Sequence, residues 1–357
     1  MARSVTLLSV LVSALYAGLV CAQQTTPSAD ENQTYCAYVT EAAKAQSDLL
    51  RTPSAVAAFT QPETGLPTQI VGGATLSLSN LTKSGLTLEA ARKNCDLYRA
   101  SLAATQSVQY AIPNIEKQAL LHRLSLIESV SKSLEESIAQ SRKMVDAQNM
   151  TRPMLFELET TRIKLEADRA DTQSRIAALY VPTLDTSPLK AQIAAKQSAD
   201  ISEQRAQSRI ARQNNWDVAL TVGAHQQIYP VAEGTKPYGE VTVTYNLASR
   251  SIDRHLDRSV DAYGEWKKSQ ASEVEQGAEI LHRQAGDLLA AQQARLDSLH
   301  RQARQIADNI TLVQDPQTSA ALDFRNTLTT TQLLLDIEIG DAEFRQERLQ
   351  LFLASNF

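Results

Sequence analysis

Apolar residues after position 250 recur at steps of three and four, which is the period of one face of an α-helix. The stripe contains no proline and has Lys267 as a polar gap; its members are Ile252, Leu256, Val260, Tyr263, Val274, Ala278, Leu281, Ala285, Leu288, Leu296, Leu299, Ala303, Ile306, Ile310 and Val313. This pattern predicts one uninterrupted amphipathic helix over about 250–313, with a length of about 95 Å. Such a helix cannot fit inside an ordinary globule.

The first half of the chain carries a matching apolar stripe over about 85–148. Its members are Leu88, Ala91, Cys95, Tyr98, Leu102, Thr105, Ile112, Ile115, Ala119, Val130, Leu134, Ile138 and Val145. Pro113 falls inside this stripe. Because proline removes one hydrogen bond from a helix interior, we expect a bend or an interruption at Pro113, at a cost of about 3 kcal/mol.

Each long stripe follows a segment in which apolar and polar residues alternate, as they do in a strand. The alternating segments are 68–82 and 238–248. Proline-marked turns then follow the stripes, and shorter return helices follow the turns; the turns lie at 149–153 and 313–317, and the return helices at 154–180 and 319–354. The spacing of apolar residues therefore changes from every second residue to about every 3.6 residues at corresponding places in the two halves.

The two halves repeat one order of elements. Leu81 precedes Leu247 by 166 positions and Pro153 precedes Pro316 by 163, which is the signature of an internal repeat. Each repeat is predicted as helix, strand, strand, long helix and return helix; the opening helices and first strands fall at 34–50, 54–61, 188–214 and 216–227. We expect a mainly α fold with a small β part, in which long antiparallel helical hairpins follow the strands. Its parts are a first repeat over 23–180 with strands about 54–82, a linker over 181–187, and a second repeat over 188–357 with strands about 215–249.

Four strands alone leave a sheet with two open edges, which other copies of the chain would close. The stretch 216–227 alternates apolar and polar residues as a lipid-facing barrel strand does. A sheet packed edge-on within a soluble domain is the competing interpretation, because alternation by itself is a weak signal for membrane strands.

The first 22 residues have the three-part form of a secretory signal peptide. Arg3 precedes an apolar run that ends at Val20, and we expect cleavage after Ala22. A membrane-spanning helix is disfavoured because the run is shorter than the roughly 20 apolar residues that cross a bilayer. Lipid attachment at Cys21 is disfavoured because Val20 stands where a lipoprotein signal needs a small residue.

Two cysteines remain after the signal peptide, Cys36 and Cys95. In an oxidising exported compartment an even pair favours a disulfide between them. Two small buried thiols are the alternative.

Composition favours long helices over compact mixed domains. Aromatic residues make up only 5% of the chain, which has 12 glycines, and 335 residues would remain after cleavage. The mature chain would have 34 basic and 40 acidic residues, and its net charge of −6 makes nucleic acid an improbable partner.

No arrangement of residues indicates catalysis, a cofactor or a metal ion. The histidines are scattered, and neither mature cysteine has a partner at zinc-ligand spacing. Gly72-Gly73 lacks the lysine-serine ending of a phosphate loop. Asn-x-Thr sequences, which are glycosylation acceptors in eukaryotic secreted proteins, begin at Asn32, Asn80, Asn149 and Asn309. Chance supplies some of these sequences in a chain so rich in Ser and Thr. We expect a protein that is not an enzyme.

With its duplicated order of elements, matched long helices and paired turns, the chain resembles the TolC-type outer-membrane efflux and secretion channels over essentially the whole mature sequence. The resemblance implies a homo-trimer in which each copy contributes four strands to a shared β-barrel in the outer-membrane lipid. The helices would form an α-barrel tunnel in the periplasm of a Gram-negative bacterium. A periplasmic adaptor and an inner-membrane transporter engage the lower end of the tunnel in that family.

The resemblance also assigns roles to the turns and to nearby charges. The turns would be periplasmic tips that contact an adaptor; they comprise Met150, Thr151, Arg152, Pro153, Val313, Gln314, Asp315 and Pro316. Ordinary helix-hairpin turns are the alternative. The nearest candidates for a pore constriction are Arg304, Asp308 and Asp315, for which a solvated charged face is the alternative.

The function that the sequence favours is the outer-membrane channel of an export system, passing solutes from periplasm to exterior. A periplasmic coiled-coil adaptor and a structural spacer without a pore are the alternatives. The strands of both repeats favour the channel, since a spacer would need them only as linkers.

Overall fold

The computed structural model describes residues 29–60, 68–147, 150–229, 234–269, 272–313 and 318–357. The elements in chain order are α1 Ala29–Arg51, β1 Ser54–Thr60, β2 Thr68–Ser77, α2 Leu78–Asp146, α3 Arg152–Ala178, α4 Leu189–Arg212, the 3-10 turn η1 Gln213–Asn215, β3 Trp216–Tyr229, β4 Lys236–Tyr245, α5 Ser249–Ser269, α6 Glu273–Leu312 and α7 Ser319–Asn356. The predicted fold class, mainly α with a small β part, is confirmed.

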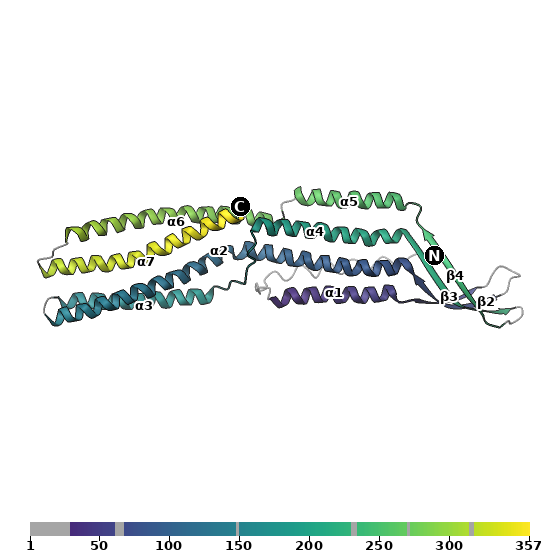
Figure 1. Cartoon of the computed structure of the whole chain (residues 1–357), viewed down its shortest axis with the longest axis horizontal. Helices are drawn as coiled ribbons and strands as arrows, with labels where there is room; N and C mark the ends of the chain where they lie inside the picture. Colours follow the sequence, from purple (N-terminus) through teal and green to yellow (C-terminus); the bar gives the residue numbers. More distant parts are fainter. Residues whose placement is uncertain (1–28, 61–67, 148–149, 230–233, 270–271, 314–317) are drawn as a thin grey trace, which may run out of the picture.

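The helices form an elongated layer, with the sheet at one end and the adjoining ends of α2 and α3 and of α6 and α7 at the other (Figure 1). In the half next to the sheet, neighbouring helices pack in the order α1, α2, α4, α5. In the other half the order is α3, α2, α7, α6. The helix α2 runs through both halves, so it is the element that joins them.

The helix α2 is 69 residues long and continues through Pro113. Its axis changes direction in the middle of its length (Figure 1). Of the two outcomes expected at Pro113, the interruption is therefore absent. The helix begins at Leu78, earlier than predicted, because Ser77 caps it by accepting a 3.1 Å hydrogen bond from the Asn80 amide.

The second long helix is in two pieces, and the prediction of one uninterrupted helix over 250–313 is wrong. The helix α5 ends at Ser269 and α6 begins at Glu273. Ser272 starts α6 with a capping box: its hydroxyl accepts from the Glu275 amide at 3.3 Å, and its amide donates to the Glu275 carboxylate at 2.6 Å. These reciprocal bonds satisfy two amides that only a helix start leaves free, so they stabilise a new helix there.

The four strands form one antiparallel sheet in the order β1, β2, β3, β4. The central pair, β2 with β3, brings together strands from the two halves of the chain. Each strand predicted from alternation is present, and the segment predicted over 68–82 stops at Ser77, where α2 begins. The predicted repeat boundaries remain predictions, and the predicted signal peptide, including Cys21, lies outside the described residues.

The apolar core is a seam along the helices. One cluster joins α2, α3 and α7; its buried members are Ile127, Leu134, Ile138, Met150, Met154, Leu158, Leu165 and Ile337. The seven-residue steps from Ile127 to Leu134 and from Leu158 to Leu165 are those of coiled-coil packing. The predicted linker 181–187 has no helix or strand, and beyond it the Asn356 side chain near the end of α7 accepts from the Leu189 amide at 2.8 Å.

Candidate functional site

One face of the sheet is mainly apolar on all four strands, although Gln226, which pairs with Ile70, also lies on it. Residues paired across antiparallel strands point to the same side, and the register places one set of them together: Ala55, Ile70, Ala74, Leu76, Trp216, Val218, Leu220, Val222, Val241, Val243 and Tyr245. Val241 and Val243 are 65% and 69% exposed, and Trp216, Leu220, Val222, Tyr245 and Ile70 are also exposed. Because the chain leaves so many large apolar side chains of one surface in contact with solvent, this apolar face marks an interaction surface.

The opposite face, here called the polar face, holds most of the polar strand residues, although Val56 of β1 and Val71 of β2 also lie on it. It carries all the charged side chains of the described strand residues, namely Asp217, Lys236 and Glu240, together with His225. Thr75 and Thr221 share a 2.8 Å hydrogen bond across β2 and β3 on this polar face. The alternation seen in the sequence therefore separates the sheet into one apolar and one polar surface.

Both edges of the sheet are open within the described residues. The strand β1 pairs only with β2, and β4 pairs only with β3. An open edge presents unpaired backbone amides and carbonyls, which bind another strand readily. Two open edges on one sheet therefore suit closure by further copies of the same chain.

The sheet is fixed to the helices through Asp217. Its carboxylate accepts hydrogen bonds from the hydroxyls of Ser77 at 2.6 Å and Ser79 at 2.7 Å. Ser79 is fully buried, so its hydroxyl needs such a partner. The contact holds β3 of the second half against the junction of β2 and α2 in the first half.

The first predicted tip is packed at the end of the molecule opposite to the sheet (Figure 1). Met150 is buried in the core seam, whereas Arg152 and Pro153 are exposed in the first turn of α3. The Thr151 hydroxyl donates to the Asp323 carboxylate of α7 at 2.9 Å. The tip is therefore joined to the second hairpin, and contact with an adaptor remains a prediction.

The second predicted tip follows α6. Val313 caps the end of α6 and its amide donates to the Ile310 carbonyl at 3.2 Å. Gln314, Asp315 and Pro316 lie outside the described residues. Their role as an adaptor-contacting tip remains a prediction.

The predicted constriction residues Arg304 and Asp308 lie exposed on α6. The guanidinium of Arg304 donates from Nε to the carbonyl of His300 at 3.3 Å. The third candidate, Asp315, lies outside the described residues. A role of these charges in narrowing a pore remains a prediction.

A cluster of ion pairs that the sequence analysis missed joins all four helices of the half away from the sheet. Four arginines and four carboxylates, with Gln292, line a cleft of about 500 Å³; the charged residues of this ion-pair cleft are Glu116 and Arg123 of α2, Asp168 and Arg175 of α3, Arg295 of α6, and Glu338, Asp341 and Arg345 of α7. The sequence does contain a pattern that indicates the ion-pair cleft. Three of these helices carry two opposite charges seven residues apart, and this spacing places both charged residues on one helix face.

Arg123 is the centre of the ion-pair cleft. Its Nη2 contacts the carboxylates of Asp168 at 2.8 Å and Glu338 at 2.7 Å. Burial alone would lower the pKa of Arg123, but the hydrogen bonds with Glu338 and Asp168 outweigh burial and raise it above its ordinary value. The cluster keeps its charges and fastens the α2–α3 hairpin to α7.

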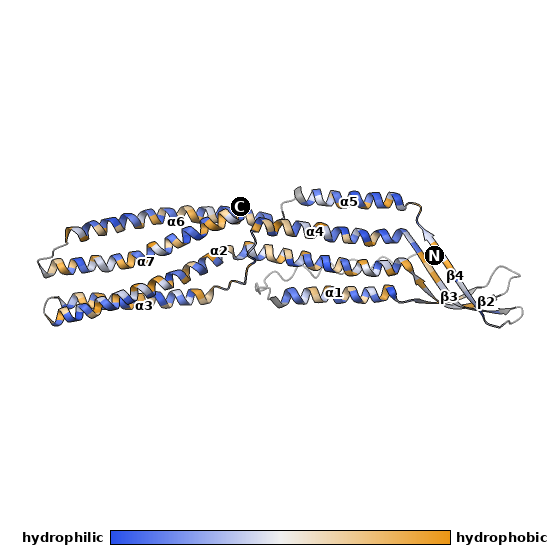
Figure 2. Ribbon diagram, in the orientation of Figure 1, coloured by the Kyte–Doolittle hydropathy of each residue, from blue (hydrophilic) through white to orange (hydrophobic). Residues whose placement is uncertain are grey.

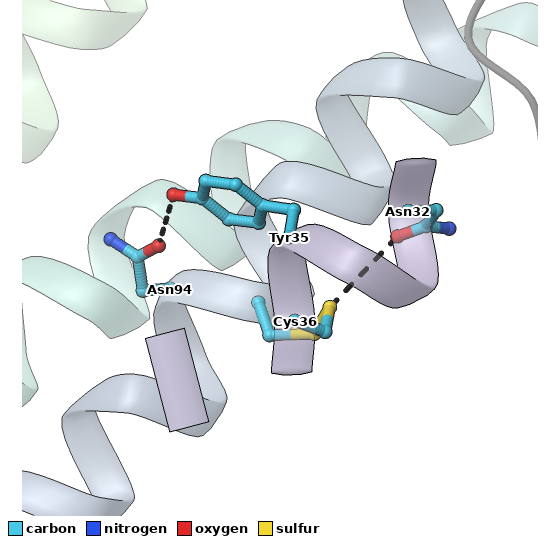
Figure 3. Close-up of a disulfide and its surroundings, with 5 residues drawn as sticks. Asn32, Tyr35, Cys36 and Asn94 are labelled. Carbon is cyan, nitrogen blue, oxygen red and sulfur yellow. Dashed lines mark hydrogen bonds between the residues drawn. A yellow bond between two sulfur atoms is a disulfide. The ribbon is translucent and has the colours of Figure 1, made fainter. Parts of the chain in front are cut away.

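The predicted disulfide is present between Cys36 of α1 and Cys95 of α2, whose Cα atoms are 5.2 Å apart (Figure 3). Beside it the Tyr35 ring stacks on Tyr98 with centroids 3.9 Å apart, and the Tyr35 hydroxyl donates to Asn94 at 2.7 Å. The bridge and the two tyrosines together fasten the first turns of α1 to α2.

Neither a metal site nor a membrane-spanning helix is found in the part of the chain that the structure describes. No three His, Cys, Asp or Glu side chains there are placed to hold a metal ion. Apolar and polar residues alternate along the helices (Figure 2), and none of the described helices is both long and apolar enough to cross a membrane.

Known proteins resemble this chain in structure and not in sequence. No protein-family model and no curated protein matches it. The MtrE outer membrane channel of Neisseria gonorrhoeae in its open state is 13% identical, with 91% of this chain and 85% of that chain covered and a TM-score of 0.45. A structure of CusC described for its transmembrane channel formation is 14% identical, with coverages of 90% and 87% and a TM-score of 0.43. The outer membrane protein VceC of Vibrio cholerae is 12% identical, with 94% of each chain covered and a TM-score of 0.40.

These solved structures are outer-membrane channels of the TolC type, the family that the sequence resembles. Their identities lie below 25% and their TM-scores below 0.5.

Proposed function

We propose that the chain is one subunit of an outer-membrane channel that passes solutes out of the periplasm. The observation that carries this proposal is the sheet, whose apolar face is exposed and whose two edges are open. Further copies of the chain would pair with the open edges, and lipid would cover the apolar face. The polar face would then line the pore.

The helices support the same assembly. Large apolar side chains are exposed on the outermost helices of each half of the layer: Tyr38 and Leu49 on α1, Trp266 on α5, Phe156 and Ile163 on α3, and Ile280 and Leu312 on α6. Side-by-side copies would bury these side chains, as packed helix seams do. A ring of such layers is a tube, and we propose a homo-trimer.

The remaining parts of the proposal concern place and partners. A cleaved signal peptide over residues 1–22 would deliver the chain to the periplasm, and the sheet would lie in the outer-membrane lipid. A periplasmic adaptor and an inner-membrane transporter would engage the end of the helices that lies opposite to the sheet. We propose no catalytic activity, because the sequence offers no nucleophile, base or metal-ligand arrangement.

The order of the strands disfavours a spacer. A structural coiled coil would use the strand segments as irregular linkers, whereas β2 pairs with β3 along its whole length, from Thr68 to Ser77. An adaptor without a pore would have no use for an exposed apolar sheet face.

Purified full-length protein tests the proposal in three measurements. Its native mass in mild detergent should correspond to three chains, its migration on a gel should change on heating, and it should produce stepwise conductance in a planar lipid bilayer. A soluble monomer without conductance would refute the channel.

A further inference from the structure

We infer that Glu240 makes the sheet end of the pore select for cations over anions. This inference rests on the proposed function, because it requires that the polar face of the sheet lines a pore. It goes further than the channel proposal by naming the charge class of the preferred solute and the residue that sets it.

Glu240 ends a row of oxygen-bearing side chains that crosses the whole sheet. The strand register pairs Ser54 with Thr75, Thr75 with Thr221, and Thr221 with Glu240. Because each pair lies directly opposite across two antiparallel strands, all four side chains are on the polar face at one height. We call these four residues the oxygen row.

Hydrogen bonds within and beside the oxygen row hold it together. The hydroxyls of Thr75 and Thr221 lie 2.8 Å apart, and Thr242 donates to the Glu240 carboxylate at 3.2 Å. Glu240 itself is exposed, so its charge faces water and not a protein interior. A carboxylate charge that faces water repels anions.

The charges around Glu240 decide the sign of the effect. On the polar face, Asp217 adds a second carboxylate where the sheet meets α2, while Lys236 adds one positive charge nearer the other end of β4. His225 pairs with Lys236 across the strands. Each copy therefore brings a net charge of about −1 to this face, summed over the formal charges near neutral pH.

Symmetry turns this single carboxylate into a ring. In a closed assembly every copy places its Glu240 at the same height, and rings of Asp or Glu are the arrangement by which cation channels attract cations. The hydroxyls of the oxygen row offer further oxygen atoms to a passing cation, which favours hard cations over anions.

A second explanation for Glu240 comes from its position on the edge strand β4. Charged residues on edge strands prevent unwanted pairing with other proteins. That explanation predicts that neutralising Glu240 causes aggregation, and that lysine at this position protects as well as glutamate does. If Glu240 instead sets the ion selectivity, the variant with a neutral residue at this position should assemble normally and show a changed ion preference.

The test measures the cation-to-anion permeability ratio of purified full-length protein in a neutral planar bilayer under a potassium chloride gradient. Wild type should prefer potassium, Glu240→Asp should keep this preference, and Glu240→Gln should lower the ratio about two-fold near 0.1 M salt and by more at 0.01 M, where screening is weaker. Glu240→Lys should lower the ratio further. Native mass measured on each variant separates selectivity from loss of assembly.

The outcomes distinguish the two proposals. Conductance with the same permeability ratio in wild type and Glu240→Gln would leave the channel standing and overturn the role of Glu240. Aggregation of Glu240→Gln with rescue by Glu240→Lys would also overturn it, in favour of edge protection. Absence of conductance in the wild type would overturn the channel itself and this inference with it.

Discussion

Arg123 of α2 and Glu338 of α7 form a 2.7 Å ion pair that joins the two halves of the chain. The Arg123 side chain is only 16% exposed, and it also contacts Asp168 and the buried Asp341. Removing one partner of a buried pair leaves the other charge without compensation, and this penalty exceeds what the pair contributes when it is intact. The ion-pair cleft is therefore sensitive to single substitutions.

We predict that Arg123→Met lowers the free energy of unfolding by about 3 kcal/mol. Thermal unfolding in detergent, followed by circular dichroism, measures the change. Arg283→Met is the matched control, because Arg283 pairs with Glu279 on the exposed surface of α6, where the expected change is below about 1 kcal/mol. Equal effects of the two substitutions would show that the ion-pair cleft is no more important than an ordinary surface pair.

The same pair predicts a pH dependence. Burial would raise the pKa of Glu338, but the hydrogen bonds and charges of Arg123 and Arg295 outweigh burial and hold it below its ordinary value of about 4.3. A carboxylate whose pKa is depressed on folding stabilises the fold above its unfolded pKa, and this contribution disappears as the pH falls through the folded pKa. Glu338→Gln should therefore destabilise at about pH 7, with a difference from wild type that shrinks below about pH 4. A difference that stays constant in acid would contradict this assignment.

The disulfide predicts a large loss of stability on removal. Cys36 and Cys95 are 59 positions apart, and closing a loop of that size stabilises a fold by about 4 kcal/mol in the chain-entropy model. The double variant Cys36→Ser, Cys95→Ser should unfold at a lower temperature than wild type. A dithiol reductant should lower the midpoint of the wild type and leave that of the double variant unchanged. Equal midpoints for the oxidised wild type and the double variant would refute a stabilising role.

Glycine is required where β2 and β3 approach each other. A Cβ atom on Gly223 would lie 2.8 Å from the Gly73 Cα and 2.9 Å from the Tyr238 ring, both closer than real Cβ contacts. Gly223→Ala should therefore cost about 2 kcal/mol, since overpacking forces the backbone to shift. Gly239→Ala on β4 is the control, because a Cβ there meets nothing within 4 Å. Refolding yield and thermal midpoint compare the two variants, and equal values would contradict the close approach.

Periodicity made much of this fold predictable. The step of three and four along α2 shows which side chains are buried together, and the alternation along β4 shows which side chains share one face of the sheet. The break after Ser269 was missed because the apolar stripe resumes at Val274, eleven residues after Tyr263, in phase with an unbroken helix. Ser272 and Glu275 form the capping-box sequence, and they were the local signal that a new helix starts.

The ion-pair cleft could be predicted only in part. The opposite charges of Glu116 and Arg123, seven residues apart, mark one polar face of α2. The charges on the other helices reach this face of α2 because α7 packs between α2 and α6. No local sequence pattern encodes this packing order of the helices. Formation of the proposed oligomer likewise depends on surfaces whose partners would belong to other copies.

The adjacent residues Thr242 and Val243 provide the sharpest test of the two sheet faces. They are neighbours on β4, yet Val243 pairs with Val218 on the apolar face while Thr242 pairs with Ala219 on the polar face. If lipid covers the apolar face, Val243→Lys places a charge in hydrocarbon at a cost of about 2–4 kcal/mol near the bilayer centre, whereas Thr242→Lys places it in water. Val243→Lys should reduce the heat-modifiable protein in the membrane fraction and Thr242→Lys should not. The two variants place the same charge on opposite faces of β4. Equal membrane assembly of both variants would therefore show that lipid does not contact the apolar face.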